Sequence, residues 1–495
     1  MPPDHSQPAD LFDAVIVGAG FSGLCLAIRL RQAGRRFVLL EQAASLGGTW
    51  RDNRYPGAAC DVPSDLYCYS FAPKPDWSRR YPLQAELRAY LEGCADHFGV
   101  RDAIRFGHGV HEARFDPALG QWRVRAGPQE ETFRARCLIV ATGGLSRPRM
   151  PEVEGLDSFS GALFHSARWN PEASLTGRHI GVIGTGASAI QIVPELAKQA
   201  GTLKVFQRTP AWVLPRHDPA VPGWRQRAYR RFPWLQRLSR ALIQAQLESR
   251  ALAFTRAPWL LRAAGPVVGL FRRWQLRDPA LRRAFRPDYV LGCKRVLLSN
   301  DFYPAFDRGA AQLVTSPIVR ILPAGIETAD GRQHALDVLV VCTGFHAAEA
   351  GVPFLVHGRD GRELNAQWRE GARAYLGTEV AGFPNLFLMT GPNTGLGHSS
   401  IVLMIEAQAD YILDALAQLQ ARPDRAVEVR AEAQARYNTW LQARLAGTVW
   451  NTGGCRSWYR SATGLNTTLW PGLTGGFRRL TRRFDPQVHE FIDID

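Results

Sequence analysis

The stretch DAVIVGAGFSGLCLAIRLRQAGRRFVLLE, residues 13–41, decides the fold of the first part of this chain. Its apolar start is rich in β-branched residues and predicts a buried parallel strand. A G-x-G-x-x-G turn follows, built from Gly18, Gly20 and Gly23, and a helix-like spacing of apolar residues comes next. A second apolar run closes the stretch. This order predicts a strand–helix–strand unit that binds a dinucleotide.

Each glycine of the turn has its own physical role. Gly18 permits the tight turn, Gly20 lets the backbone approach a pyrophosphate, and Gly23 lets the helix pack closely on the strand. The start of the helix offers free N–H groups to the phosphates. Glu41, about 20 residues further on, can accept hydrogen bonds from both hydroxyls of a ribose. A carboxylate at this place favours a free ribose, as in FAD or NAD.

A second unit of the same kind contains RHIGVIGTGASAI, residues 178–190. Its turn has Gly184 and Gly186, and an alanine replaces the third glycine, which the pattern allows. The next predicted strand ends in Arg208, with Thr209 beside it. A guanidinium at this place favours the 2′-phosphate of NADP. The two units therefore predict two cofactors, FAD in the first and NADPH in the second.

The composition of the chain limits the class of protein. Its 495 residues are 46% hydrophobic and 21% charged, so sizeable cores are expected and long disordered segments are not. Most of the net charge of +15 comes from arginines between residues 208 and 295, but no nucleic-acid-binding motif accompanies them. We interpret them as a basic surface that also attracts a phosphorylated cofactor. The eight cysteines form no C-x-x-C pair, so neither a zinc site nor a dithiol redox centre is indicated, and no metal is expected.

The sequence also bears on membrane association. Residues 1–10 are polar and lack the basic start and apolar run of a signal peptide. No later stretch approaches the ~20 apolar residues that a membrane span requires. We therefore expect a cytoplasmic protein without an integral membrane span. The alternating aromatic and arginine residues of segment 211–286, which prolines are expected to break into short helices, leave peripheral membrane contact open.

A further motif lies between the two units. Residues 159–170 read FSGALFHSARWN. This resembles the fingerprint F-x-G-x-x-x-H-x-x-x-W of the Baeyer–Villiger monooxygenases, which Pro or Asp usually follows. The matching residues are Phe159, Gly161, His165 and Trp169. Asn170 departs from the usual last residue, whereas Trp169 separates the chain from the related N- and S-oxygenating flavin monooxygenases, which have Tyr or Phe there.

Two other blocks support the same resemblance. GGTWRDNRYPGAACD, residues 47–61, is similar to the family's stretch over the flavin, G-G-x-W-x-x-x-x-Y-P-G-x-x-x-D. Lys294 and Arg295 lie in a segment that resembles the one carrying the family's active-site arginine. The motifs occur in family order, and the chain looks most like the shorter members.

The resemblance implies an α/β fold with two Rossmann-type dinucleotide-binding domains and an inserted helical region. An FAD-binding domain is expected at residues 1–145 and 380–495, and an NADP-binding domain at 146–210 and 312–379. The helical insertion, 211–311, should border the active site. The implied cofactor contacts, besides the phosphate-binding glycines, are Glu41, Thr49, Trp50, Asp61, Tyr67, Val110, Gly184, Gly186, Ser188, Gln191, Arg208, Thr209 and Lys294.

The implied reaction uses FAD, NADPH and O₂ to insert an oxygen atom next to a ketone carbonyl, giving an ester or lactone via a C4a-peroxyflavin. Arg295 is the implied catalytic group, because an anionic peroxide and an anionic adduct both need a fixed positive charge. Asp61 would hold and tune that arginine. His165 and Trp169 are expected in the linker between the domains.

Three other functions remain as alternatives. An N- or S-oxygenating flavin monooxygenase shares both cofactors, but Trp169 and the Asp61/Arg295 pair argue against it. An NADPH-dependent disulfide reductase lacks its C-x-x-C motif here. A non-catalytic flavoprotein has no need of Arg295 and Asp61. The expected partners of the chain are thus a small ketone and O₂, not nucleic acid.

Overall fold

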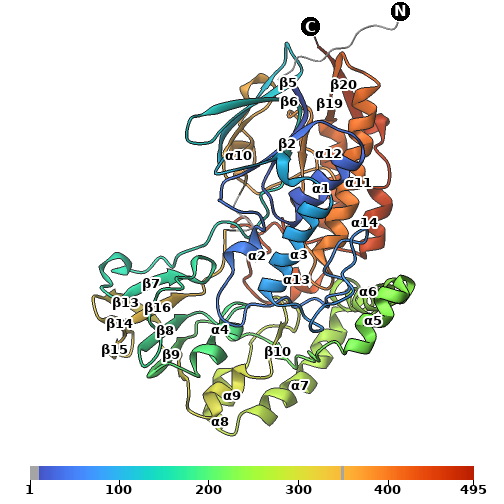
Figure 1. The fold of residues 1–495 in the computed structure, drawn as a ribbon. Helices are drawn as coiled ribbons and strands as arrows, with labels where there is room; N and C mark the ends of the chain where they lie inside the picture. The colour runs from blue at the N-terminus through green and yellow to red at the C-terminus, as the bar shows by residue number, and fades with distance from the viewer. Residues whose placement is uncertain (1–10, 347–350, 495) are drawn as a thin grey trace, which may run out of the picture.

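The computed structural model describes residues 11–346 and 351–494, so residues 1–10 of the expected first domain lie outside the described part. Two lobes, the first built on a mixed sheet and the second on a parallel sheet, are flanked by a line of helices (Figure 1). Helices and strands occur where the two predicted strand–helix–strand units place them. The expected α/β fold is confirmed. No helix within the described ranges is long and apolar enough to cross a membrane.

The first sheet has eight strands in the order β17-β4-β5-β6-β1-β2-β3, with β18 also paired to β6. Strands β1, β2 and β6 are parallel to one another. Their apolar stretches, residues 14–17, 37–40 and 137–140, are buried on both faces. The strands are β1 Leu11–Val17, β2 Phe37–Glu41, β3 Ile104–Phe106, β4 Val110–Asp116, β5 Gln121–Ala126, β6 Glu131–Val140, β17 Leu355–His357 and β18 Leu386–Leu388.

Helices from both ends of the chain cover this sheet. Helix α1 (Phe21–Gln32) packs between α11 (Ile401–Gln420) and α3 (Gln84–His97), and α14 (Thr474–Leu480) packs on α11 (Figure 1). The remaining elements of this lobe are α2 Thr49–Asp52, α10 Leu364–Gln367, β19 Arg425–Val429, α12 Ala431–Ala446, α13 Val449–Thr452 and β20 His489–Asp493. The lobe therefore needs residues that lie far apart in the sequence.

The second sheet is wholly parallel, in the order β12-β9-β8-β16-β7. Helices α4 (Ala189–Leu196) and α9 (Phe302–Asp307) pack together against its buried side chains. Its strands are β7 Ala162–His165, β8 His179–Ile183, β9 Thr202–Phe206, β12 Gln312–Val314 and β16 Val338–Val341. A small antiparallel sheet lies beside it, formed by β13 Ile318–Leu322, β14 Gly325–Thr328 and β15 Gln333–Ala335.

The chain returns to the first sheet earlier than expected. Strand β17, at Leu355, pairs with β4 of the first sheet, although the sequence placed residues up to 379 in the second domain. The expected boundary at residue 380 thus falls after this return. The sequence signal was weak because β17 has only three residues.

The helical insertion is less broken than its prolines suggested. It contains α5 Gly223–Arg231, α6 Pro233–Thr255, α7 Pro258–Gln275 and α8 Pro279–Ala284, between the short strands β10 Val213–Leu214 and β11 Leu297–Leu298. Pro233, Pro258 and Pro279 stand at the first position of a helix, where the missing N–H has no partner to lose. Only Pro266 lies inside a helix of the insertion. The expectation of short helices was therefore wrong for the 23-residue α6 and the 18-residue α7.

Candidate active site

The first glycine turn leaves space where a pyrophosphate can lie. Gly18 has a φ of +105°, and a Cβ on it would meet the Ala141 carbonyl oxygen at 2.7 Å. Gly20 faces Gly48, and a Cβ on Gly48 would stand 3.1 Å from the Gly20 Cα. Helix α1 begins at the next residue, so its free N–H groups point at this space. The turn fits a dinucleotide such as FAD.

Glu41 ends β2 beside this turn. One carboxylate oxygen accepts the backbone N–H of Ala19 at 2.8 Å, and the other accepts the N–H of Ala43 at 3.0 Å and Nη1 of Arg51 at 2.8 Å. A carboxylate has roughly four acceptor positions, so one remains for a ribose hydroxyl. Val110 begins β4 just after His108, whose N–H donates to the Glu41 carbonyl.

An aromatic wall stands next to the turn. Thr49 begins α2, and the following residue, Trp50, donates from Nε1 to the hydroxyl of Tyr67 at 3.2 Å. The Tyr67 ring also packs edge-on against Phe21, the first residue of α1. Burial raises the pKa of Tyr67, so its hydroxyl stays protonated. These predicted flavin-side residues therefore lie together.

Arg295 and Asp61 meet at the junction of the lobes, although 234 positions separate them. Nε donates to Oδ2 at 2.6 Å and Nη2 donates to Oδ1 at 2.7 Å, which is the two-pronged geometry of the strongest ion pairs. Burial alone would raise the pKa of Asp61, but the Arg295 guanidinium holds that pKa below its usual range. The Asp61 carboxylate in turn raises the pKa of Arg295 against the effect of burial. Both groups are therefore charged at any working pH.

The tail of the chain completes the surroundings of Arg295, through residues that no motif marked. The Leu396 carbonyl accepts Nη1 of Arg295 at 3.5 Å. Tyr459 is fully buried nearby, and burial raises its pKa to about 12 while the Arg295 charge lowers it. No motif marked Tyr459, since its role depends on packing between distant segments.

A disulfide fixes this tail segment to the arginine's own segment. Cys293 and Cys455 are bonded, with Cα atoms 6.1 Å apart and 162 positions between them. The sequence showed no C-x-x-C pair and gave no sign of this bond, because disulfide partners this far apart are set by the fold. Cys293 lies two residues before Arg295, so the bond holds the Trp450 to Trp470 stretch beside the site.

The second glycine turn also leaves space for a phosphate group. Gly184 has a φ of +109°, and a Cβ on Gly186 would meet nothing within 4 Å. The Thr185 hydroxyl donates to the Thr209 carbonyl at 3.0 Å, which joins the turn to the end of β9. Burial lowers the pKa of Lys294, and the positive charge of the nearby, exposed Arg208 lowers it further. Two neighbouring cations fit the 2′-phosphate of NADPH.

Ser188 and Gln191, both predicted as cofactor contacts, bridge the lobes in this structure. Gln191 accepts the Tyr55 hydroxyl at 3.0 Å and donates to the Ala59 carbonyl at 3.0 Å. Hydrogen bonding to Ser188 lowers the pKa of Tyr55, although burial dominates and raises it to about 12. The loop before Asp61 is thereby tied to helix α4. A direct contact of either residue with a cofactor stays a prediction.

The fingerprint residues lie on and beside β7, the edge strand of the second sheet, whereas the sequence placed His165 and Trp169 in a linker between the domains. Phe159 is buried, and a Cβ on Gly161 would meet the Asp337 carbonyl oxygen at 2.2 Å, which explains the glycine. His165 ends β7, accepts the Ala167 N–H on Nδ1 at 3.1 Å and packs edge-on against Phe345. Trp169 is buried against Phe164. These side chains support the sheet and the turn after β16.

Asn170 replaces the usual Pro or Asp without losing the turn. Its side-chain oxygen accepts the Glu172 N–H at 3.0 Å. An aspartate would make the same local hydrogen bond. The departure from the fingerprint is thus compatible with its backbone geometry.

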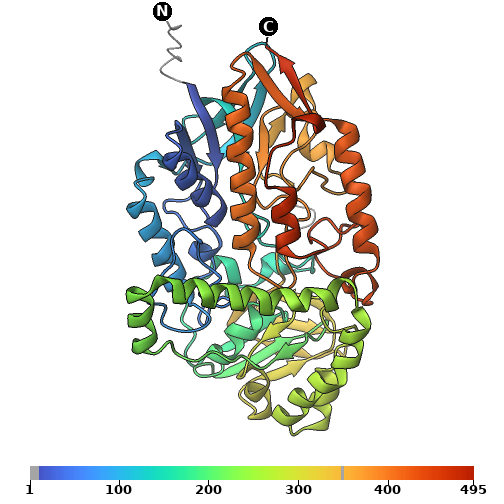
Figure 2. The same ribbon diagram turned by 90° about the vertical axis from the view of Figure 1, so that its right-hand side faces the viewer.

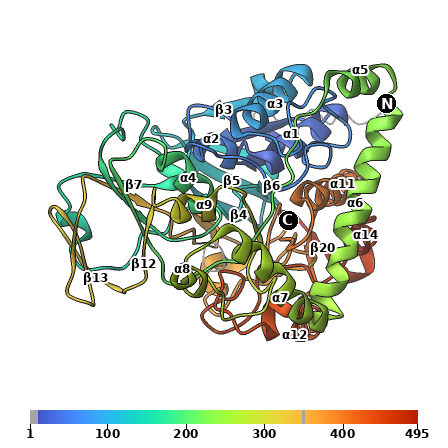
Figure 3. The same cartoon turned by 90° about the horizontal axis from the view of Figure 1, so that it is seen from below.

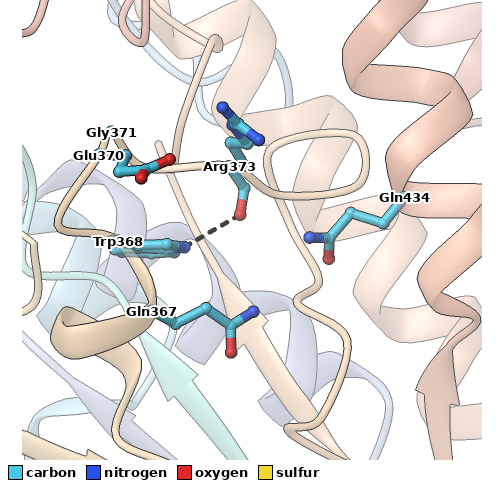
Figure 4. Close-up of a pocket in the computed structure, with 6 residues that line it drawn as sticks. All are labelled: Gln367, Trp368, Glu370, Gly371, Arg373 and Gln434. Atoms are coloured by element: carbon cyan, nitrogen blue, oxygen red, sulfur yellow. Dashed lines mark hydrogen bonds between the residues drawn. The ribbon is translucent and has the colours of Figure 1, made fainter. Parts of the chain in front are cut away.

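A small pocket lies elsewhere in the first lobe (Figure 4). Gln434 of α12 faces it, and Trp368 donates from Nε1 to the Arg373 carbonyl at 3.0 Å. The pocket shares no lining residue with the site around Arg295.

Comparison with known proteins identifies the family. A model of the flavin-binding monooxygenase-like family matches residues 13–252. A Baeyer–Villiger monooxygenase of Pseudomonas aeruginosa is 43% identical over 96% of this chain and 90% of that protein. Another, of Streptomyces coelicolor, is 44% identical over 99% and 94% of the two chains. This chain belongs to the Baeyer–Villiger monooxygenases.

Solved structures agree with that assignment. A steroid monooxygenase bound to NADP has a TM-score of 0.87 and 32% identity, over 98% of this chain and all of that one. A closed cyclohexanone monooxygenase has a TM-score of 0.88 and 28% identity over the same shares. This Baeyer–Villiger monooxygenase uses FAD, NADPH and O₂ to insert an oxygen atom beside a ketone carbonyl. The expected cofactors and reaction are confirmed.

The buried fingerprint histidine of this Baeyer–Villiger monooxygenase gives a prediction for pH. Burial lowers the pKa of His165 to about 4. Its ordinary pKa is about 6.5, so the unfolded chain binds a proton that the native state refuses between these values. The stability linked to His165 is therefore complete above pH 6.5 and falls as the pH drops toward 4.

Urea unfolding of wild type and His165→Asn at pH 7 and pH 5 tests this. Between pH 7 and pH 5, we expect the free energy of unfolding to fall by about 2 kcal/mol more in the wild type than in the variant. Asparagine keeps an acceptor for the Ala167 N–H. Equal losses in the two proteins would show that His165 does not carry this pH dependence.

Proposed function

We propose that Arg295 is the catalytic residue of ketone oxygenation and that Asp61 is its positioning residue. The observation that carries this assignment is the two-pronged ion pair between them, which lies near Tyr67 of the aromatic wall and near Tyr459 of the tail segment. We also propose that the lobe of the first sheet holds FAD and the lobe of the second sheet holds NADPH. The two different strand ends, Glu41 and Arg208, support that division.

When bound, FAD would supply the oxygen chemistry, with NADPH as the source of the reducing equivalents. Arg295 contributes a fixed positive charge to the anionic groups that form during the reaction. Because Asp61 raises its pKa, Arg295 does not lose its proton to them. Asp61 also fixes the direction of the guanidinium, which is held by two parallel hydrogen bonds.

The surroundings of the ion pair are partly open to solvent. The side chains of Arg295 and Asp61 are 33% and 31% exposed, and buried Tyr459 and the tail segment, held by the Cys293–Cys455 bond, lie beside them. Electrostatic stabilisation is larger where protein atoms replace part of the water. Tyr459 remains a phenol here, since its pKa is raised to about 12.

The proposed contact between Arg208 and the 2′-phosphate of NADPH gives a prediction for nucleotide preference. Arg208→Ala should raise the KM for NADPH about 10- to 100-fold, the effect of losing a charge-assisted hydrogen bond, and leave that for NADH unchanged. The matched control is Arg178→Ala. Arg178 is exposed and directly precedes β8, at the end away from the glycine turn. Steady-state kinetics with both nucleotides measure it, and an equal rise for NADH would remove the 2′-phosphate contact from the proposal.

The reaction itself is tested by product analysis. The purified yellow protein is supplied with NADPH and ¹⁸O₂, and a panel of cyclic, linear and aryl ketones is screened for esters and lactones by mass spectrometry. We expect labelled oxygen in the product. Oxidation of sulfides or amines, without any ketone, would favour the N- or S-oxygenating alternative.

The cytoplasmic location and the domain limits stay predictions. Within the domain limits, we propose that the returning segment of the first lobe starts at β17, because this strand joins the first sheet. Cell fractionation with antibody detection tests the location.

A further inference from the structure

The outer faces of α6 and α7 carry apolar stripes that are largely exposed to solvent. Four residues of α6 point away from its buried side: Trp234, Leu238, Leu242 and Leu252. Four residues of α7 do the same: Trp259, Val267, Leu270 and Trp274. These eight side chains are 46 to 79% exposed. Such a concentration of large apolar side chains on a surface marks an interaction site.

The spacing shows that the stripes are real faces of helices. Trp234, Leu238 and Leu242 follow each other every four residues, so they lie in one row along α6. The buried residues of α6, including Leu247 and Phe254, occupy the opposite side. In α7, Leu270 and Trp274 repeat the same spacing. Each helix therefore has two apolar sides, one packed against the rest of the protein and one facing outward.

The charge around these stripes is of one sign. Between residues 223 and 275 the chain has eleven arginines and a single acidic residue, Glu248, which is occupied by Thr474. Seven of these arginines are exposed and have no carboxylate within 4.0 Å among the described residues: Arg227, Arg231, Arg237, Arg250, Arg256, Arg262 and Arg273. A second copy of the chain would bring arginine against arginine. The face instead complements an anionic surface.

The position of the helices in the molecule matters as well. Figure 2 shows α6 lying across one side of the molecule with α7 continuing from its end, and Figure 3 shows the two from below at its margin. Their inner sides reach the active-site segment. A Cβ on Gly292 would meet the ring of Phe254 at 2.5 Å and Leu261 at 3.3 Å, so α6 and α7 both pack on the residue three before Arg295.

We propose that the outer face of α6 and α7 docks on an anionic lipid bilayer. The apolar stripes enter the interface between head groups and acyl chains, where tryptophan is enriched in membrane proteins. The arginines bind the lipid phosphates. The helices then lie in the plane of the membrane with the active-site segment directly behind them. An apolar ketone dissolved in the bilayer has a short path to the site, a consequence that rests on the proposed function.

Vesicle sedimentation tests the docking. Purified holoenzyme is mixed with vesicles of phosphatidylcholine and phosphatidylglycerol, 3:1, or of phosphatidylcholine alone, and the bound fraction is measured over a range of NaCl. We expect binding to the anionic vesicles that weakens as salt rises. Wild type that stays in the supernatant with anionic vesicles, or that binds both kinds equally at all salt concentrations, would overturn the proposal.

Matched variants separate the apolar from the electrostatic contribution. Trp259→Ser/Trp274→Ser and Arg262→Glu/Arg273→Glu should each weaken the partition coefficient at least about tenfold. Trp440→Ser, an exposed tryptophan of α12, and Arg105→Glu/Arg134→Glu, exposed in the first sheet, should not change it. Circular dichroism and FAD content confirm that each variant is folded.

Two further measurements distinguish membrane docking from self-association and from a failure of the proposed function. Self-association in light scattering that Trp259→Ser/Trp274→Ser abolishes, without vesicle binding, would assign the face to a second copy and overturn the proposal. Ketone turnover without vesicles is measured in parallel. If the wild type turned over no ketone, the proposed function would be contradicted, but the sedimentation result would still decide whether the face docks on a bilayer.

Discussion

Arg295→Ala should lower ketone oxygenation at least about 10²-fold, the effect of removing one positioned donor from a developing anion. The charge of Arg295 is held in place by Asp61 through two hydrogen bonds of 2.6 and 2.7 Å, and alanine removes it completely. Reduction of the flavin by NADPH should stay within a few-fold of wild type, because hydride transfer forms no anionic peroxide or adduct that needs the charge of Arg295. Stopped-flow absorbance measures the reduction and mass spectrometry measures the product.

Two companion variants distinguish catalysis from damage to the fold. Arg295→Lys keeps a charge but cannot make the two-pronged pair, so it should recover part of the activity. Asp61→Asn keeps the size of the side chain and removes the charge that raises the pKa of Arg295, so it should act mainly on kcat. Wild-type product formation by Arg295→Ala would end the assignment of this arginine, and loss of both reduction and oxygenation would indicate a structural effect.

Gly23→Ala should give protein without bound FAD or no folded protein at all. A Cβ on Gly23 would stand 1.8 Å from the Gly18 carbonyl oxygen, a backbone atom that cannot move without opening the turn. The expected loss of FAD affinity is at least about 100-fold, since overpacking against a backbone costs up to about 3 kcal/mol or more. The ratio of flavin to protein absorbance in the purified variant measures it.

Gly93→Ala is the matched control for this change. Gly93 also lies in a helix, α3, and a Cβ there would meet nothing within 4 Å. Alanine at an open helical position should stabilise the fold by about 0.5–1 kcal/mol and leave FAD in place. Normal flavin content in Gly23→Ala would show that the turn relaxes, against the geometry of the structure.

Local pattern predicted the two nucleotide-binding units well. Strand, turn and helix follow within about thirty residues, so the alternation of apolar runs and glycines specifies them without help from the rest of the chain. The position of Glu41 at the end of β2 and of Arg208 just after β9 was also visible, because strand ends are local features. The proline-rich insertion shows the limit of such patterns. Proline at a helix start and proline as a helix breaker look the same in a sequence.

The candidate site was predictable only through family resemblance. Nothing in the residues around Asp61 or around Arg295 indicates that they form an ion pair. The resemblance marked both, but it did not mark Tyr459, the Leu396 carbonyl or the Cys293–Cys455 bond that complete the site. Gln191 joins α4 to the loop before Asp61, and its expected contact with a cofactor stays a prediction.

By itself, the sequence determined the fold class and the two cofactors, because glycine turns and charged strand ends act over short distances along the chain. It indicated the reaction family only through the resemblance of its motifs. The tertiary structure alone decided how the site is assembled. Four separate segments meet at Arg295, and which residues of different segments touch depends on the packing of both lobes and the helices between them. The same holds for the outer face of α6 and α7. A helix pattern reveals that it has two apolar sides, and only the packed structure shows which of them remains outside.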